Sequence, residues 1–167
     1  MKRNVISVLV DNHPGVLFRI SGLFSRRGYN INSLTVSCTE NKDLSRMTVL
    51  CTGDERTVEQ IMKQLNKQED VKKVMRLKEE TASLGDVALV KLYTDKNRGK
   101  IMDTVNELGA TIVDMSDHTI TVQITGSYKH VDAALKTFYQ LDVAEVARTG
   151  LVGLENGDRC LIDYEEE

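Results

Sequence analysis

The sequence predicts an α+β fold in which the element order βαββαβ occurs twice along the chain. Short segments that alternate apolar and polar residues, as strands do, are interleaved with segments whose apolar residues recur at helical spacing. Gly28 and Gly109, about eighty residues apart, each end the first helical segment of one half. A mostly charged and small stretch over residues 78–85 separates the two halves. We therefore expect two small domains of the same design.

The composition of the chain limits the kinds of partner and compartment that we expect. Its 167 residues are 41% hydrophobic and 28% charged, which is typical of a globular protein. A net charge of -3 provides no basic surplus for phosphates, so we expect no nucleic acid partner. No apolar stretch approaches the length of a membrane span, so we expect no membrane partner either. Cys38, Cys51 and Cys160 form neither a metal pair nor an even disulfide set, which favours a cytoplasmic location.

The first half of the chain contains the elements of one complete βαββαβ unit. An apolar run over residues 5–10 predicts a strand, which ends at the turn-forming residues 11–15. The pattern then predicts, in order, a helix from Val16 that stops at Gly28, strands over 30–39 and 45–52, a helix capped by Asp54, and a strand over 71–77. A hairpin centred near Lys42 would place Val36 opposite Val49. Two helices on one face of a four-stranded antiparallel sheet form the ferredoxin-like arrangement, which alone implies no function.

The second half repeats this order with its own helical and strand segments. The pattern predicts a strand over 87–93, a helix through Ile101 to Leu108, a hairpin of 111–115 and 119–125, a helix over 131–138, and a strand over 143–148. This half is therefore expected to be a second ferredoxin-like unit. We place the domains at residues 1–77 and 86–167, joined by a linker over 78–85.

Four segments of the chain resemble one protein family. Residues 8–20 read VLVDNHPGVLFRI and resemble the opening of an ACT domain, a unit that binds amino acids and regulates enzymes. Three further segments resemble the signature of the small subunits of acetohydroxyacid synthase, also called acetolactate synthase: GLFSRRGYNINSLTV (22–36), LSRMT (44–48) and VAEVARTG (143–150). The resemblance covers essentially the whole chain and implies an ACT domain over residues 1–77. The physical role of the last segment does not follow from the sequence.

The resemblance implies a regulatory subunit without catalytic residues of its own. Such a subunit activates a large, catalytic subunit and confers feedback inhibition by a branched-chain amino acid, for which valine is the first candidate. Thiamine diphosphate, Mg²⁺ and FAD are expected on the catalytic subunit, and no cofactor is expected in this chain. The resemblance also implies a homodimer formed through the ACT domains. Arg26 and Arg27, at the end of the first helix, either contact the catalytic subunit or complement the helix dipole.

The turn at residues 12–15 is the candidate effector site. It lies at a helix N-terminus, where unpaired backbone N–H groups and the helix dipole favour a carboxylate. Pro14 suits a helix start, and Gly15 lets a ligand approach the backbone without a Cβ in the way. An ordinary Pro-Gly turn capped by Asn12 explains the same residues, so the residue pattern alone leaves both interpretations open.

The resemblance adds a second part to this site. In the family, the asparagine that matches Asn30 faces the amino acid across a dimer interface with the turn of the other chain, and its carbonyl could accept from the ligand ammonium. Leu17 and Ile31 could close an apolar pocket on a branched side chain, although each also suits the core. The effector-binding residues that the resemblance implies are Asn12, His13, Pro14, Gly15, Val16, Leu17, Asn30 and Ile31.

The sequence shows no catalytic constellation and no metal site. His13, His118 and His130 are scattered, and none lies at a metal-ligand spacing from another His or Cys. Asp114 and Asp117 could form a carboxylate pair, but no nucleophile, base motif or phosphate-binding glycine loop accompanies them. We therefore expect no chemistry in this chain.

Two other functions fit parts of the sequence. A free-standing ACT-type sensor that controls transcription or another enzyme explains the N-terminal half but not the segment at 143–150. An RNA-binding ferredoxin-like module would carry exposed aromatic residues on its central strands. Phe18, Phe24 and Phe138 lie instead on predicted helices, which disfavours RNA binding.

Overall fold

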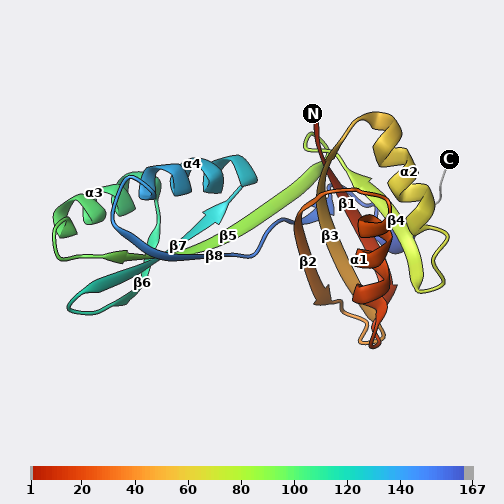
Figure 1. Ribbon diagram of the computed structural model, residues 1–167, viewed down its shortest axis with the longest axis horizontal. Helices are drawn as coiled ribbons and strands as arrows, with labels where there is room; N and C mark the ends of the chain where they lie inside the picture. The colour runs from red at the N-terminus through yellow and green to blue at the C-terminus, as the bar shows by residue number, and fades with distance from the viewer. Residues whose placement is uncertain (1, 164–167) are drawn as a thin grey trace. The chain divides into compact units, whose positions relative to one another are not determined.

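The computed structural model describes residues 2–163, and the chain divides into two compact units (Figure 1). The first unit comprises the residues up to Leu84 together with the segment from Leu151 onward, and the second comprises Gly85–Gly150. Each unit has a hydrophobic core between two helices and one face of an antiparallel sheet. Within the described residues, no helix is both long and apolar enough to cross a membrane.

The first unit follows the predicted βαββαβ order. Its elements are β1 (Lys2–Asp11), α1 (Val16–Arg26), β2 (Ile31–Cys38), β3 (Leu44–Gly53), α2 (Glu55–Leu65) and β4 (Val71–Leu77). The strands pair antiparallel in the order β2-β3-β1-β4, so β2 and β4 lie at the two edges of this path. The predicted cap of α2 is confirmed, because the Asp54 carboxylate accepts a hydrogen bond from the Thr57 N–H at 2.8 Å.

The main core of the first unit lies between its helices and one face of the sheet. Ile6, Val8 and Val10 alternate along β1 and pack with the apolar stripes of α1 and α2, which include Ile20 and Ile61. These five side chains are at most 1% exposed. Because full burial of such a side chain stabilises the fold by about 1.5–3 kcal/mol, this face holds the sheet and helices together.

The pairing of β2 with β3 differs from the expected register. Val36 lies opposite Met47 rather than Val49. The hairpin is centred earlier than expected because the Thr39 N–H donates to the Leu44 carbonyl at 3.1 Å and closes the loop between them. A shift of two residues keeps Val36 on the face that Val49 and Met47 share. A further register shift between Ile31 and Ser33 moves Ile31 onto that same core face, although strict alternation would place it on the opposite face from Val36.

The C-terminal segment covers the second face of the first sheet. β9 (Val152–Glu155) pairs with β5 (Ala82–Tyr93), and the short 3-10 helix η1 (Leu161–Asp163) packs on β1 and β4. The apolar residues that are buried on this side include Val5, Leu9, Leu50, Met75, Leu77, Leu151 and Leu161. Through these residues the C-terminal segment packs against β1 and β4.

The boundaries of the two units differ from the predicted domains at two points. The segment from Leu151 onward belongs to the first unit, whereas the sequence pattern places it in a C-terminal domain over 86–167. Half of the predicted linker over 78–85 is strand, because β5 begins at Ala82, whose side chain is only 8% exposed. The apolar outer face of the first sheet explains both differences, because α1 and α2 both pack on its other face and leave this one to be covered by a later segment.

The second unit repeats the same order, as the sequence predicts. After β5 come α3 (Arg98–Leu108), β6 (Thr111–Met115), β7 (Thr119–Gly126), α4 (Tyr128–Phe138) and β8 (Val143–Arg148). The strands pair antiparallel in the order β6-β7-β5-β8. Gly109 ends α3 in the left-handed conformation with φ +62°, and Ser127 caps α4 by accepting from the His130 N–H at 3.2 Å. The predicted tandem ferredoxin-like architecture is confirmed.

The structure explains the segment that ends at Gly150, whose role the sequence did not indicate. Arg148 Nε donates to the buried Asp86 carboxylate at 2.7 Å, and its Nη1 donates to Asp132 Oδ1 at 3.0 Å. The guanidinium also lies 4.5 Å from the centre of the Tyr128 ring. Burial lowers the pKa of Arg148, but the hydrogen bonds to the two carboxylates outweigh it and raise the pKa above its ordinary value. Arg148 is therefore a structural clamp that neutralises a buried acid.

Candidate functional site

The turn between β1 and α1 has the geometry that an anionic ligand needs. Gly15 occupies the N-cap position of α1 with φ +92°, a left-handed conformation that glycine adopts without strain. No side chain of the described residues caps this helix. Among the described residues, the N–H groups of Leu17 and Phe18 have no hydrogen-bond partner and are available to a carboxylate, and the Leu17 side chain, 46% exposed, lies beside them.

The Asn12 side chain does not cap α1, so the interpretation of the turn as a capped Pro-Gly turn is wrong. Its Nδ2 donates to the Lys42 carbonyl at 2.8 Å and lies 3.6 Å from Cys38 Sγ. Its backbone N–H donates to the Asp43 carbonyl at 2.7 Å. Asn12 thus fastens the turn to the β2–β3 hairpin. Among the described residues no donor reaches its Oδ1, which is left free to accept from a ligand.

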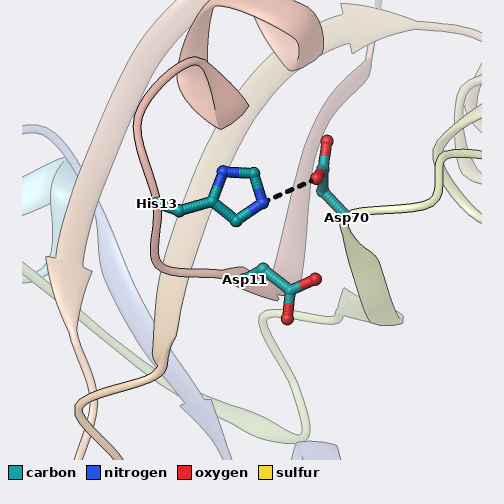
Figure 2. Close-up of side chains that lie close together, drawn as sticks. All are labelled: Asp11, His13 and Asp70. Atoms are coloured by element: carbon teal, nitrogen blue, oxygen red, sulfur yellow. Dashed lines mark ion pairs between the residues drawn. The ribbon is translucent and has the colours of Figure 1, made fainter.

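A cluster of charged side chains lies beside the turn. His13 Nε2 is 3.0 Å from Asp70 Oδ1, and Figure 2 shows this ring and carboxylate facing each other with Asp11 close by. Asp70 Oδ2 accepts from Arg19 Nε at 2.5 Å, and Lys72 Nζ lies 2.6 Å from Asp11 Oδ2. The hydrogen bond from Arg19 holds the pKa of the Asp70 carboxyl below its ordinary value, and His13 acts in the same direction against the effect of burial. The same contact raises the pKa of Arg19.

This cluster was not expected from the sequence, which indicates no metal-ligand spacing around His13. Ligand atoms of Asp11, His13 and Asp70 lie within 4.8 Å of one another, a spacing that would suit a metal ion. However, Arg19 and Lys72 already pair with the two carboxylates, so the cluster is balanced in charge without an added cation. The only local signal was the Asp-x-His spacing, because Asp70 comes from a distant part of the chain.

The other predicted site residues are distributed over the first unit. His13 and Pro14 are exposed in the turn, whereas Val16 is buried at 3% exposure in the main core and has no free side chain to offer a ligand. Asn30 is exposed just before β2, and Ile31 is half-buried against the main core. The turn therefore supplies backbone and polar groups, and among the predicted site residues Leu17 and Ile31 are left to make apolar contacts with an effector.

Asn30 and the turn lie at opposite ends of the sheet within one chain. Ile31, which follows Asn30, pairs with Cys51 on β3, and Cys51 pairs with Asn4 near the start of β1. The turn follows Asp11 at the other end of β1, seven residues further on, or roughly 23 Å along the strand. A single chain therefore cannot place both parts of the predicted site around one amino acid.

Comparison with known proteins assigns both units of the chain. Residues 6–73 match the family described as the AHAS small subunit-like ACT domain, and residues 86–157 match the family described as the small subunit of acetolactate synthase. The acetolactate synthase small subunit of Mycolicibacterium smegmatis is 41% identical over 157 residues, which cover 93% of this chain and 92% of that protein. The acetolactate synthase isozyme 3 small subunit of Escherichia coli K12 is 40% identical over 161 residues, covering 95% and 99%.

A solved structure supports the same assignment. The crystal structure of the acetolactate synthase small subunit from Thermotoga maritima superposes with a TM-score of 0.88 at 35% sequence identity, covering 95% of this chain and all of that one. The agreement extends over both units in sequence and over the fold. The chain therefore belongs to the family of acetolactate synthase small subunits, the regulatory and non-catalytic components of that enzyme.

Proposed function

We propose that this chain activates the catalytic large subunit of acetolactate synthase and makes it subject to feedback inhibition by a branched-chain amino acid, with valine as the first candidate. The observation that carries the proposal is the turn before α1, where the N–H groups of Leu17 and Phe18 and the Oδ1 of Asn12 have no hydrogen-bond partner within residues 2–163. An α-amino acid presents a carboxylate and an ammonium a few ångströms apart. The backbone N–H groups can donate to the carboxylate, and the Asn12 amide oxygen can accept from the ammonium.

The preference for a small apolar side chain follows from the neighbours of the turn. The carboxylate would accept from the N–H groups at the start of α1, and the ammonium would donate to the amide oxygens of Asn12 and Asn30. Leu17 is an exposed apolar residue on the first turn of α1, next to the more exposed Phe18. With Ile31 it offers an apolar surface for a branched aliphatic side chain, whereas a charged side chain would find no partner on these two residues.

We propose that the complete site forms between two copies of the chain. β2 is an edge strand, so its backbone can pair with the same strand of a second copy. In an antiparallel pair, the start of one β2 lies beside the end of the other. Because Cys38, at the end of β2, contacts Asn12, this pairing would bring Asn30 of one copy to the turn of its partner. A two-fold dimer therefore resolves the separation of the two parts within one chain.

The catalytic partner supplies the chemistry in this proposal. Thiamine diphosphate, Mg²⁺ and FAD are expected on the large subunit and none of them on this chain. The free cysteines Cys38, Cys51 and Cys160 suit the reducing cytoplasm in which we expect the complex to work. The alternative of a free-standing sensor loses its support, because the family match extends through the second unit as well.

Reconstitution with the cognate catalytic subunit tests the proposal. We expect no acetolactate from this chain alone, a higher rate when it is added to the catalytic subunit, and inhibition of that added activity by valine, isoleucine or leucine. The proposed function would be refuted if adding this chain changed neither the rate of the catalytic subunit nor its response to valine.

Mixed dimers test the two-chain site directly. Gly15→Asp places a side chain and a negative charge at the turn, and Asn30→Ala removes the amide at the other part, so a dimer of either variant has no intact site. A dimer that contains one chain of each variant has one site with both defects and one intact site. Neither variant alone should bind the effector, and we expect mixing them to restore effector binding at up to half of the sites of the mixed dimers. If mixing restores nothing while the dimers exchange chains, the site lies within one chain.

A further inference from the structure

We propose that Asp70 is a positioning residue for the effector turn, which it holds from both sides of Gly15 through its two carboxylate oxygens. The inference rests on the proposed function of that turn. Asp70 immediately precedes β4 and is 8% exposed. Its carbonyl accepts from the Asp11 N–H at 2.8 Å, so its backbone is attached to the end of β1. Asp70 therefore lies next to the effector turn, although it is far from the turn in the sequence.

The two oxygens of Asp70 contact residues on opposite sides of the N-cap. Oδ1 pairs with His13, two residues before Gly15, and Oδ2 pairs with Arg19, four residues after it. Hydrogen bonds to a carboxylate are short and directional. The Asp70 carboxylate therefore connects His13, before Gly15, with Arg19 at the start of α1. This connection restricts the rotation of the peptide groups between these two residues.

The contact with Arg19 also controls the space beside Gly15. A Cβ built on Gly15 would lie 3.2 Å from Arg19 Nη1, so this guanidinium borders the turn where a ligand would approach. Asp70 holds the guanidinium in that place and neutralises its charge. Without the carboxylate, Arg19 could rotate into the ligand position, and the turn would lose the anchor that His13 provides.

An ordinary stabilising role predicts a different outcome from a positioning role. If Asp70 only stabilises the fold, its loss lowers the fraction of chains able to bind, which calorimetry reports as reduced stoichiometry. If Asp70 orders the turn before the ligand arrives, its loss weakens affinity at unchanged stoichiometry, because binding must then include the cost of ordering. Asp54 provides a matched control, since it is another hydrogen-bonded acid of the first unit and follows Gly53, which pairs with Lys2 at the far end of β1.

The experiment compares Asp70→Asn, Arg19→Gln and Asp54→Ala in the full-length chain. Calorimetry with valine should show about tenfold weaker binding for Asp70→Asn, the loss expected from one hydrogen bond to a charged group, with unchanged stoichiometry. Arg19→Gln should weaken binding in the same direction and combine non-additively with Asp70→Asn, because the two residues share one contact. Asp54→Ala should lower the melting temperature without changing affinity. Arg19→Gln alone still decides the question if Asp70→Asn fails to fold.

A measurement without effector separates this inference from the proposed function. Amide exchange at Asn12 and Arg19, whose N–H groups bond within and around the turn, should accelerate in Asp70→Asn. Unchanged exchange and unchanged valine affinity would overturn the role of Asp70 and leave the proposed function intact. Weaker affinity that merely parallels the melting temperature across all three variants would also overturn it. If the wild-type chain binds no branched-chain amino acid although exchange at the turn depends on Asp70, the proposed function fails and the ordering of the turn by Asp70 stands.

Discussion

Replacement of Leu161 by alanine tests whether the end of the chain belongs to the first unit. Leu161 is 3% exposed in η1, which packs on β1 and β4, and it is not part of the main core between the helices and the sheet. Large-to-small substitution of a buried leucine costs about 2–5 kcal/mol, and a short terminal segment can relax into part of the cavity. We therefore expect about 2–3 kcal/mol of destabilisation. With an m-value of about 2 kcal/mol/M in urea, the midpoint of the first unit moves down by roughly 1 M.

Ile162 is the matched control for this prediction. It is adjacent to Leu161 but 58% exposed, so Ile162→Ala should change the stability by less than about 0.5 kcal/mol. Urea titration followed by amide NMR signals of β1 and β7 reports the two units separately. Equal effects of the two substitutions, or an equal shift of the β7 signals, would refute the assignment of this segment to the first unit.

Three further predictions follow from the charged contacts and the turn. Arg148→Ala leaves the buried Asp86 without its clamp and should destabilise the second unit by about 3–5 kcal/mol, measured by urea unfolding followed through β7. Asn12→Ala should weaken effector binding roughly ten- to a hundredfold and Gly15→Asp should weaken it more, both measured by inhibition titration of the reconstituted enzyme. Because folding lowers the pKa of Asp70, its stabilising effect should be complete above about pH 4 and lost as acid protonates it, so the melting-temperature difference between wild type and Asp70→Asn should shrink from pH 7 to pH 3.

The boundary of the first unit also changes what a shortened chain should do. A fragment of residues 1–77 lacks both β9 and η1, so it exposes Leu9, Leu50, Met75 and Leu77 on the outer face of the sheet. Such a fragment should be less stable than the unit in the whole chain and prone to self-association. Tests of effector binding therefore need the full chain, in which β9 and η1 cover the outer face of the sheet.

The order of elements in both units was predictable because it depends on local patterns. Apolar alternation, helical stripes and the stops at Gly28 and Gly109 act within a few residues, and the structure contains the corresponding strands and helices. The register of the β2–β3 hairpin was less secure, since it depends on where the loop closes. A change of one position in the centre of the turn moves every pair by two residues, and the hydrophobic alternation is the same in both cases.

The sequence by itself determined the family, the two ferredoxin-like units and the turn at residues 12–15, because each of these is written in contiguous residues. Tertiary structure alone decided that Asn12 fastens the turn to the hairpin, that Asp70 meets His13 and Arg19, and that the C-terminal segment covers the first sheet. These contacts join residues far apart in the chain. The sequence around Asp70, Asn12 or Leu161 does not indicate which distant residue each will contact. Only the folded sheet brings these partners within contact distance.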